Sequence, residues 1–499
     1  MKIITWLLYA VRPLQVDELA IAAALKPGMI FDVDEKLDLD SISAICRSFV
    51  KVNEQARTPI VELAHFSVAE YFKCPKLLDG TTPNPDFIGE IDGHRLLALS
   101  CLSYLLSPPF DKGPCKTVDE FWKLFRTPFR YSREWWHAHA KVVEKDEMVY
   151  ETVQLYLVAP AHGAWSQLTD YMKSRDKKFR PPSFRFLEGA DGPPLKLLDC
   201  HLASPIHTAV EFGLNHVLQK LVRDGLDVNV KGAKWTYPLG IAIENGNTDA
   251  IQLLLAGHAD IGLRLSSGRT FLHLATECRN KEAIKMLLAA GANVNLPDNG
   301  GFIAFFSLFR RMGYFRARSG PVAQDADIET IKLLFHESII SNDRLSNFAL
   351  DDLSARNNTE AVKFFLASGA KHTGRWVFGR LCDAAISGNC QLIQALVDGG
   401  ANIHSSDRLC RKPIHFAVAN GQFEVFEYLS KLMYPSFISI SKNIPPPSPN
   451  CPYLEHPDFW INHIERLVVL DPDDPVWHDM LGDLYLKSGK RAAALASFD

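Results

Sequence analysis

The sequence lacks the short motifs by which many enzymes and metal sites are identified. Across its 499 residues there is no G-x-x-x-x-G-K-[ST] loop to cradle phosphates, no H-E-x-x-H zinc motif and no G-x-S-x-G nucleophile elbow. His137 and His139 form an H-x-H pair, but positions two apart on a helix do not face the same way. We therefore predict that the chain is not an enzyme and has no catalytic residue, no metal site and no cofactor.

Three further scarcities narrow the class of protein. The ten cysteines form no C-x-x-C pair and no spacing pattern of a disulfide framework. Such scattered cysteines are typical of reduced intracellular thiols. No apolar run approaches the roughly 18 residues of a membrane span, and charged residues interrupt the apolar start at 3–11 too early for a signal peptide. The net charge of −4 gives no general attraction to nucleic acid. We expect an intracellular protein, more readily cytoplasmic than nuclear, without a membrane partner or a small-molecule substrate.

What the sequence does contain is a repeated phrase. It occurs as Ser204-Pro205-Ile206-His207, Tyr237-Pro238-Leu239-Gly240, Thr270-Phe271-Leu272-His273 and Lys412-Pro413-Ile414-His415, and the first three copies begin 33 residues apart. A fixed period of this size indicates a solenoid in which each unit buries its apolar face against its neighbours. The phrase resembles the T-P-L-H of ankyrin repeats, a resemblance that implies binding of a protein partner.

Each repeat can be rebuilt from local physical chemistry. Ser or Thr at the first position is a natural N-cap, and proline is harmless at the first helical position. In the resemblance, His207, His273 and His415 occupy the motif histidine position and are expected to fix the turn by hydrogen bonds. A second helix then closes on a glycine suited to the left-handed C′ position. These glycines are Gly225, Gly257, Gly291, Gly369 and Gly400.

The pattern predicts about seven repeats, with a basic, glycine-containing insertion near residues 311–324. Insertions in solenoids usually map to one face, although a tolerated surface loop is the simpler interpretation. Five residues fall at or near predicted hairpin tips and are candidate contacts for a protein partner, the alternative being that each is merely solvated. They are Trp235, Arg264, Asp298, Asn299 and Arg408.

The first 80 residues predict a winged helix. Three helices, the third at 41–48, are followed by two strands at 49–52 and 60–63, and a capping box at Ser67–Glu70 opens a last helix. The segments 6–14, 17–20 and 63–71 carry the phrase W-L-x-x-A-x-R-P-L…A-H-F-S-V-x-E-Y and resemble fungal NACHT–ankyrin proteins, which are NOD-like signalling NTPases of the STAND class. The resemblance covers roughly residues 1–190, and the repeats continue it in the family's order.

The chain also departs from that family. Those proteins carry a nucleotide-binding NACHT module ahead of the winged helix, and this sequence holds no phosphate-binding loop. The resemblance therefore does not bring NTP hydrolysis with it, and a truncated product is favoured over a naturally reduced protein. The expected role is the sensing and regulatory part of such a signalling protein.

The alternative is a nucleic-acid-associated regulator that uses the winged helix while the repeats recruit partners. Residues 1–80 carry nine Lys or Arg against eleven Asp or Glu, and acidic residues at 32–40 precede the third helix. Because phosphate contacts supply much of DNA affinity, this acidic approach disfavours nucleic acid as a partner.

The tail carries one more signal. A proline-rich linker at 434–457 leads to a stretch whose spacing of Trp477, Leu481, Gly482, Tyr485 and Gly489 resembles a tetratricopeptide repeat. Such a unit either docks on Phe459, Trp460 and Ile464 or is cut short, because one repeat cannot bury its own face. The predicted fold is mostly α. Its parts are a winged helix (1–80), a helical region and linker (81–195), ankyrin repeats (196–433), the linker (434–457) and a tetratricopeptide-like helical tail (458–499).

Overall fold

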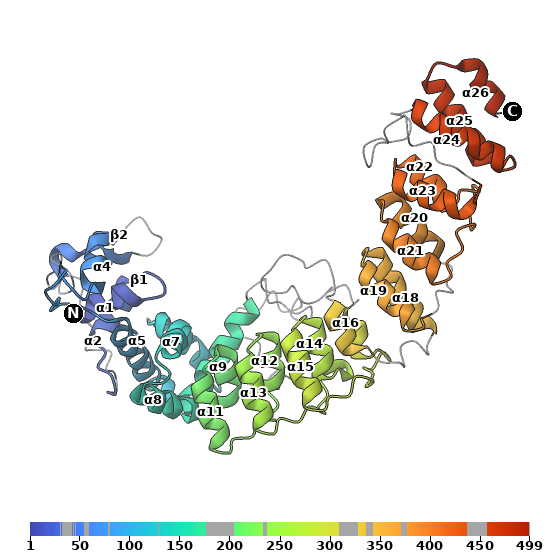
Figure 1. Ribbon diagram of the computed structural model, residues 1–499. Helices are drawn as coiled ribbons and strands as arrows, with labels where there is room; N and C mark the ends of the chain where they lie inside the picture. The colour runs from blue at the N-terminus through green and yellow to red at the C-terminus, as the bar shows by residue number, and fades with distance from the viewer. Residues whose placement is uncertain are drawn as a thin grey trace. The chain divides into compact units, whose positions relative to one another are not determined.

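The computed structural model is mostly helical, as expected, and divides into two compact units, Met1–Ala292 and Asn293–Asp499 (Figure 1). The residues that it describes are 1–29, 31, 42, 44, 46–53, 59–77, 80–127, 129–175, 204–232, 237–308, 328–335, 343–370, 377–436 and 457–498. Trp235, the insertion at 311–324, the acidic residues at 32–40 and most of the proline-rich linker lie outside these described residues.

The N-terminal segment folds as a winged helix. Its elements are α1 (Lys2–Tyr9), β1 (Leu14–Gln15), α2 (Val16–Ala24), β2 (Val50–Asn53), β3 (Ile60–Leu63) and α4 (Phe66–Lys73). The strands form an antiparallel sheet in the order β1-β3-β2, with Val52 opposite Val61. The short strand β1 was not predicted, because two residues give no visible alternation. Residues 42, 44 and 46 are helical, within the predicted third helix.

The predicted capping box at Ser67–Glu70 is wrong. Helix α4 begins at Phe66, and the extended residue His65 (φ −150°) is its N-cap. The ring of His65 accepts a hydrogen bond from the Ser67 amide at 3.2 Å and contacts the Ser67 hydroxyl at 2.8 Å. Histidine thus takes the role that serine was expected to play, two residues earlier in the chain.

The helical region packs directly on the winged helix. It comprises α5 (Glu90–Leu105), α6 (Val118–Phe125), α7 (Arg130–Val142), α8 (Glu147–Val158) and α9 (Pro160–Arg175). The buried ring of Trp6 lies edge-on to Phe129 and Tyr131, with centroids 5.6 Å away in each case. The buried carboxylate of Glu18 accepts from both terminal nitrogens of Arg12 at 2.8 Å and from the Tyr131 amide at 3.1 Å. A buried charge with this many donors fastens the two parts together.

The first three ankyrin repeats follow in the same unit. Their paired helices are α10 (Pro205–Phe212) with α11 (Asn215–Arg223), α12 (Pro238–Glu244) with α13 (Thr248–Ala256), and α14 (Phe271–Glu277) with α15 (Lys281–Ala289). Figure 1 shows α12 and α14 in one row and α13 and α15 in the next. The stacking matches the repeat predicted from the 33-residue period.

The motif histidines make the hydrogen bonds expected of them. The Nδ1 atoms of His207 and His273 lie 2.8 Å and 2.9 Å from the hydroxyls of Ser204 and Thr270. His415 Nδ1 accepts from the Lys412 amide at 2.9 Å. Each ring thus ties the start of its helix to the preceding residues, which is a structural role.

Four of the five predicted C′ glycines have a left-handed backbone, and the prediction for Gly257 is wrong. Gly225, Gly291, Gly369 and Gly400 have φ between 82° and 97°. At Gly257 φ is −82°, and the next residue, His258, takes the left-handed position with φ 62°. Gly257 meets a packing requirement instead, because a Cβ there would lie 2.6 Å from Val222 Cγ1.

The second unit contains the remaining repeats and the tail. Its repeat elements are the short helix η8 (Ala304–Leu308), α16 (Ile328–Leu334), α18 (Asp343–Ala355), α19 (Thr359–Ala367), α20 (Val377–Ser387), α21 (Cys390–Asp398), α22 (Pro413–Ala419) and α23 (Phe423–Met433). The tail forms α24 (Pro457–Leu470), α25 (Pro475–Lys487) and α26 (Arg491–Phe498). In the fourth repeat a single 3-10 turn stands where the motif was lost, and Phe305 packs there against Phe365 with centroids 5.6 Å away.

The tail docks on the last ankyrin repeat. Helix α24 packs against α23, where Phe426 lies edge-on to Trp460 with centroids 5.2 Å away. Helix α25 packs against α24, whose Phe459, Trp460 and Ile464 are buried as expected of a docked unit. The ring of Trp477 on α25 lies edge-on to the motif histidine His415, with centroids 4.1 Å away. The last repeat and the tail therefore share a continuous core.

Candidate interaction surface

The hairpin tips of three repeats are built to one plan. In each tip a backbone amide donates a hydrogen bond to the carbonyl of the residue four positions later. The pairs are Leu265 to Arg269 (2.8 Å), Asp298 to Phe302 (2.8 Å) and Asp407 to Arg411 (3.1 Å). In each tip a residue with positive φ lies just before the closing residue, namely Gly268, Gly301 and Cys410. Each of these tips therefore presents equivalent positions within its own repeat.

Asp298, one of the predicted contact residues, holds its own tip together. Its Oδ1 accepts from the amides of Gly300 at 2.8 Å and Phe302 at 3.0 Å, so much of its hydrogen-bonding capacity is used inside the turn. Asp407 does the same for the amides of Leu409 and Arg411, each at 2.9 Å. Asn299, the neighbour of Asp298, is exposed.

The two predicted arginines are both exposed at tips. Arg264 donates from Nη1 to the Gly268 carbonyl at 2.8 Å, while Arg408 lies between Asp407 and Leu409. Arg264 belongs to the first unit, whereas Asp298, Asn299 and Arg408 belong to the second.

Sequence reasoning missed the apolar side chains at these tips. Leu409 is 66% exposed and Phe302 is 43% exposed. Each lies within four residues after the aspartate that closes its tip, and that aspartate is the signal by which they could have been found. A large apolar residue exposed beside charged groups is typical of an interface anchor.

A column of carboxylates marks the ends of the first helices. Glu211 is the penultimate residue of α10, and Glu244 and Glu277 end α12 and α14, so they recur every 33 residues. Arg269 pairs with Glu277 at 2.5 Å. Loss of hydration raises the pKa of the Glu244 carboxyl, Arg269 opposes the rise and Glu277 adds to it. Negative charge at a helix C-terminus opposes the dipole, so helix stability does not explain this column.

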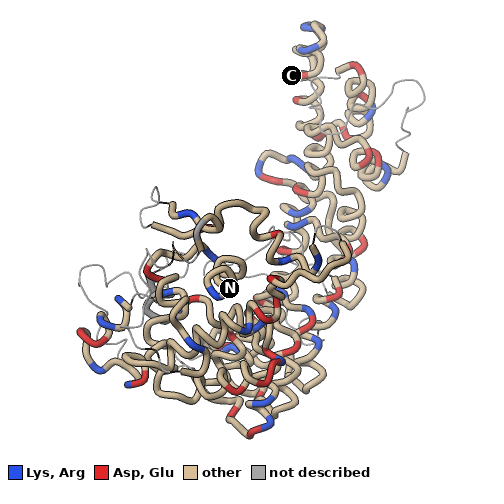
Figure 2. Tube along the Cα trace, turned by 90° about the vertical axis from the view of Figure 1, so that its left-hand side faces the viewer, with Lys and Arg blue, Asp and Glu red and all other residues tan. Residues whose placement is uncertain are grey.

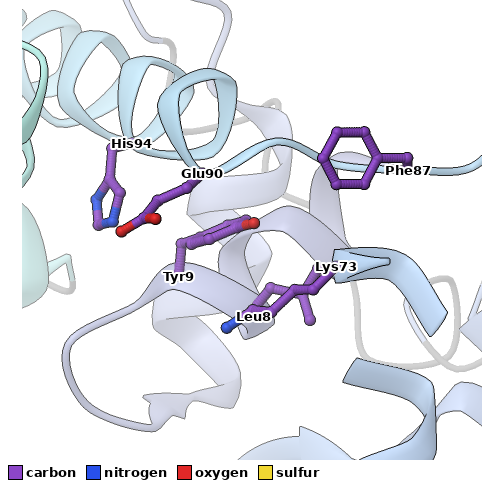
Figure 3. Close-up of a pocket in the computed structure, with 6 residues that line it drawn as sticks. All are labelled: Leu8, Tyr9, Lys73, Phe87, Glu90 and His94. Carbon is purple, nitrogen blue, oxygen red and sulfur yellow. The ribbon is translucent and has the colours of Figure 1, made fainter. Parts of the chain in front are cut away.

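A pocket of about 510 Å³ lies where the winged helix meets the helical region. It is lined by Leu8, Tyr9, Lys73, Phe87, Glu90 and His94, and Figure 3 shows the Tyr9 ring between Glu90 with His94 and the side chains of Leu8 and Lys73. The Tyr9 hydroxyl donates to the Ile88 carbonyl at 2.7 Å, and Lys73 Nζ lies 4.9 Å from the Tyr9 ring centroid. The pocket is thus framed by α1, α4 and α5.

His137 and His139 do not converge on a common point. His137 stacks on Phe212 with centroids 3.8 Å away, whereas His139 is buried and bonded to His94 and Tyr131. Within the described ranges, no group of three or more His, Cys, Asp or Glu is arranged to hold a metal ion. Of the helices that the structure describes, none is both long and apolar enough to cross a membrane.

Comparisons with known proteins agree with these parts of the fold. Residues 206–298 match the family model described as ankyrin repeats (3 copies), and residues 381–429 match ankyrin repeats (many copies). Residues 1–79 match the model described as GPI inositol-deacylase, winged helix domain. A search of curated proteins found no significant match. The chain therefore carries a winged helix of that type together with ankyrin repeats.

The solved structures to which the chain is similar include one ankyrin repeat domain. The crystal structure of the human ASB11 ankyrin repeat domain is 21% identical, covering 48% of this chain and 100% of that chain, with a TM-score of 0.34. A likeness at this level carries no argument about partners. The repeats themselves mark the chain as a protein-interaction scaffold.

Proposed function

We propose that the chain binds a protein partner through the tips and first helices of its ankyrin repeats and serves as the sensing and regulatory part of a NACHT–ankyrin-type signalling protein. The observation that carries the proposal is the tip of the last repeat. There Leu409 is exposed between Arg408 and an Asp407–Arg411 pair whose oxygen and nitrogen lie 2.7 Å apart. An apolar anchor inside a charged rim is the usual anatomy of an interface centre.

The carboxylate column adds the chemistry of the partner. Glu211 and Glu244 lie at helix ends where negative charge is unfavourable in the free protein. A partner that carries Lys or Arg at matching intervals relieves that cost on binding, so the expected partner presents basic side chains to the first unit. Figure 2 shows acidic and basic positions interspersed along the described chain, without the single-sign field that nucleic acid binding requires.

The test is affinity capture with matched variants, read by quantitative mass spectrometry. Proteins bound to the wild-type chain and lost from an Arg408→Ala/Leu409→Ala variant are partners of the tip. The control is Lys363→Ala, which removes an exposed charge from helix α19 in the same unit. If both variants retain the same set of proteins as the wild type, the tip is not the binding surface.

The signalling part of the proposal rests on the order of the parts. A winged helix of the matched type precedes ankyrin repeats, in the arrangement of the NACHT–ankyrin family that the sequence resembles. The matched winged-helix model covers residues 1–79 alone, so the enzyme named in its description does not indicate an activity of this chain. We place the protein inside the cell, more readily in the cytoplasm than in the nucleus.

The size of the endogenous protein tests this part. An antibody against the repeats and mass spectrometry of the captured product identify its N-terminal peptides. Peptides from a nucleotide-binding module ahead of Met1 support the regulatory half of an NTP-driven switch. A product of 55.9 kDa that begins at Met1 would contradict it.

A further inference from the structure

A chain of hydrogen bonds runs from the pocket into the contact between the winged helix and the helical region. His94 Nδ1 lies 2.8 Å from His139 Nδ1, and His139 Nε2 lies 2.7 Å from the Tyr131 hydroxyl. The Tyr131 oxygen in turn accepts from the backbone amide of Val11 at 2.7 Å. The chain therefore joins α5 and α7 of the helical region to the residue that follows α1.

The proton positions along this chain follow from its ends. The Val11 amide can only donate, so the Tyr131 oxygen accepts it and its own proton goes to His139 Nε2. His139 then carries its proton on Nδ1 and donates to His94 Nδ1, which must be an unprotonated acceptor. Every bond is satisfied only while both rings are neutral.

Adding one proton breaks this arrangement. The unprotonated nitrogen of His94 is the Nδ1 that accepts from His139, so a proton taken up there sets two N–H groups against each other. Reversing the whole chain would leave the Tyr131 hydroxyl proton unpaired, because the described residues offer that oxygen no partner besides Val11 and His139. Either outcome loses one hydrogen bond of the chain, and that loss is relieved only when the contact opens and water reaches His94.

His94 is the residue through which a proton enters. His139 and Tyr131 are fully buried, whereas His94 is half-buried and lines the pocket (Figure 3). Burial, together with the neighbouring His94 and His137, lowers the pKa of His139 to about 3. Burial also lowers the pKa of His94 below 6.5, opposed by Glu90 and assisted by Lys73.

Charged and titratable side chains face His94 from four of the described helices. Helix α1 contributes Tyr9, α4 contributes Lys73, α5 contributes Glu90 and α7 contributes His139 with His137 behind it. The adjacent Arg95 is held by Asp92 at 2.9 Å and by Asp146, the N-cap of α8, at 2.6 Å.

We propose that His94 is the proton-sensing residue of an acid-sensitive clasp that joins the winged helix to the helical region. Neutral His94 completes the chain that ends at Val11, and protonated His94 favours the open contact, in which its ring is hydrated. A histidine whose folded-state pKa is depressed stabilises the contact fully above about pH 6.5, and that stabilisation is lost as the pH falls through the folded-state pKa. Acidification thus loosens α1 from the helical region whichever partner the repeats bind.

The Val11 amide reports opening of the clasp, because its acceptor, the Tyr131 hydroxyl, lies across the contact. Its hydrogen exchange in the full-length chain is measured by mass spectrometry with fragmentation to single residues, from pH 7.5 to 5.0, and corrected for the intrinsic rate. In the wild type we expect the protection of Val11 to fall about tenfold for each unit by which the pH drops between about 6.5 and the folded-state pKa of His94. Protection in α14 should stay constant over the same range.

Two variants separate the clasp from general acid unfolding. His94→Asn places Oδ1 where Nδ1 was, so it accepts the bond from His139 but cannot gain a proton, and Val11 should stay protected at pH 5.5. The control His258→Asn replaces an exposed histidine whose left-handed backbone asparagine tolerates, and it should titrate like the wild type. If His94→Asn loses protection at the same pH as the wild type, the proposal is overturned.

A third variant covers the case in which His94→Asn folds poorly. Tyr131→Phe keeps the ring against Trp6 and removes only the hydroxyl. Val11 should then exchange fast at every pH, without a transition between pH 7.5 and 5.0. A retained transition at Val11 in this variant would equally overturn the proposal.

Discussion

The first ankyrin repeat meets the helical region through exposed charges and stacked rings, whereas the last repeat meets the tail through charges that are buried. At the first junction Lys220 pairs with Glu147 at 3.4 Å, and the side chain of Glu147 is 71% exposed. At the last junction Lys412 pairs with Asp474 at 2.5 Å, and the side chain of Asp474 is 2% exposed. Both junctions also carry aromatic stacks, so the ion pairs are where they differ.

The burial of each ion pair decides how much it contributes to the stability of its junction. An exposed pair is worth about 0–1 kcal/mol, because water and salt screen it. A buried ion pair adds little stability compared with apolar residues of the same shape. Removing one partner is costly, however, because it leaves the other charge buried without a partner. Although partial burial opposes it, hydrogen bonds to Asp474 and Asp471 raise the pKa of Lys412. The tail is thus held by a buried ion pair, whereas at the first junction the ion pair is exposed and the buried polar contact is the His162–Thr208 hydrogen bond at 2.8 Å.

The largest expected effect is the loss of Trp477. This fully buried ring fills the space against His415, so Trp477→Ala should cost about 3–5 kcal/mol of local stability. In a chain of several parts the appropriate measure is the opening free energy of α25 from hydrogen exchange. The matched change Phe212→Ala at the first junction should cost less, because Phe212 is only half-buried. A loss under about 1 kcal/mol at α25 would show that the tail is not docked there.

The ion pairs themselves come next. Asp474→Ala leaves Lys412 with Asp471 alone, 3.1 Å away, and should cost about 2–3 kcal/mol at α25, below the value for a fully buried pair because Lys412 is partly exposed. Glu147→Ala at the first junction should cost about 0–1 kcal/mol. Replacing both Lys412 and Asp474 by Met and Leu should recover the part of the loss due to the stranded lysine, but not the N-cap bond that Asp474 accepts from the Val476 amide at 3.1 Å, and a double-mutant cycle measures the pairwise part. Equal losses of stability for Asp474→Ala and Glu147→Ala would show that burial of the ion pair makes no difference between the two junctions.

The sequence predicts the repeat interior well and the junctions poorly. The motif histidines and four C′ glycines follow from local rules that act within a few residues. The Lys412–Asp474 pair joins positions 62 residues apart, and nothing local marks either residue as a partner of the other. The stack of His137 on Phe212 spans the junction in the same way.

The candidate surface shows the same limit. Exposed tip residues are predictable as a class, and Arg264, Asn299 and Arg408 are indeed exposed. Whether a tip residue is available for a partner depends on the turn, and Asp298 is occupied by two amides that the sequence does not reveal. The register of the carboxylate column could have been predicted from the period alone.

Acid should weaken both junctions by a similar amount, which is smaller than the loss expected for Asp474→Ala. Burial lowers the pKa of His162, bonded to Thr208 at the first junction, to about 4. At the last junction burial lowers the pKa of His415 to about 4, with Asp474 opposing the shift. Because both folded-state values lie below about 6.5, stability is full above that pH and falls below it. From pH 6.5 to 5.5 the loss should be about 1 kcal/mol per ring.

Local hydrogen exchange in α10 and α25 measures this loss at each junction. His162→Asn should flatten the pH dependence at α10 alone, and His415→Asn should flatten it at α25 alone. A variant that flattens both, or neither, would contradict the assignment of one titrating ring to each junction.

The smallest effect has a sign that separates binding from stability. Glu211→Gln and Glu244→Gln remove negative charge from helix C-termini, so each should stabilise the first unit by about 0.3–1 kcal/mol. The control Glu282→Gln removes a carboxylate from the first turn of α15, where the dipole favours it, and should destabilise by a similar amount. Local exchange at α10, α12 and α15 measures the effects of the three variants. The two C-terminal variants should bind a basic partner more weakly although they are more stable, and a variant that gains stability without losing the partner would show that the carboxylate column does not contact it.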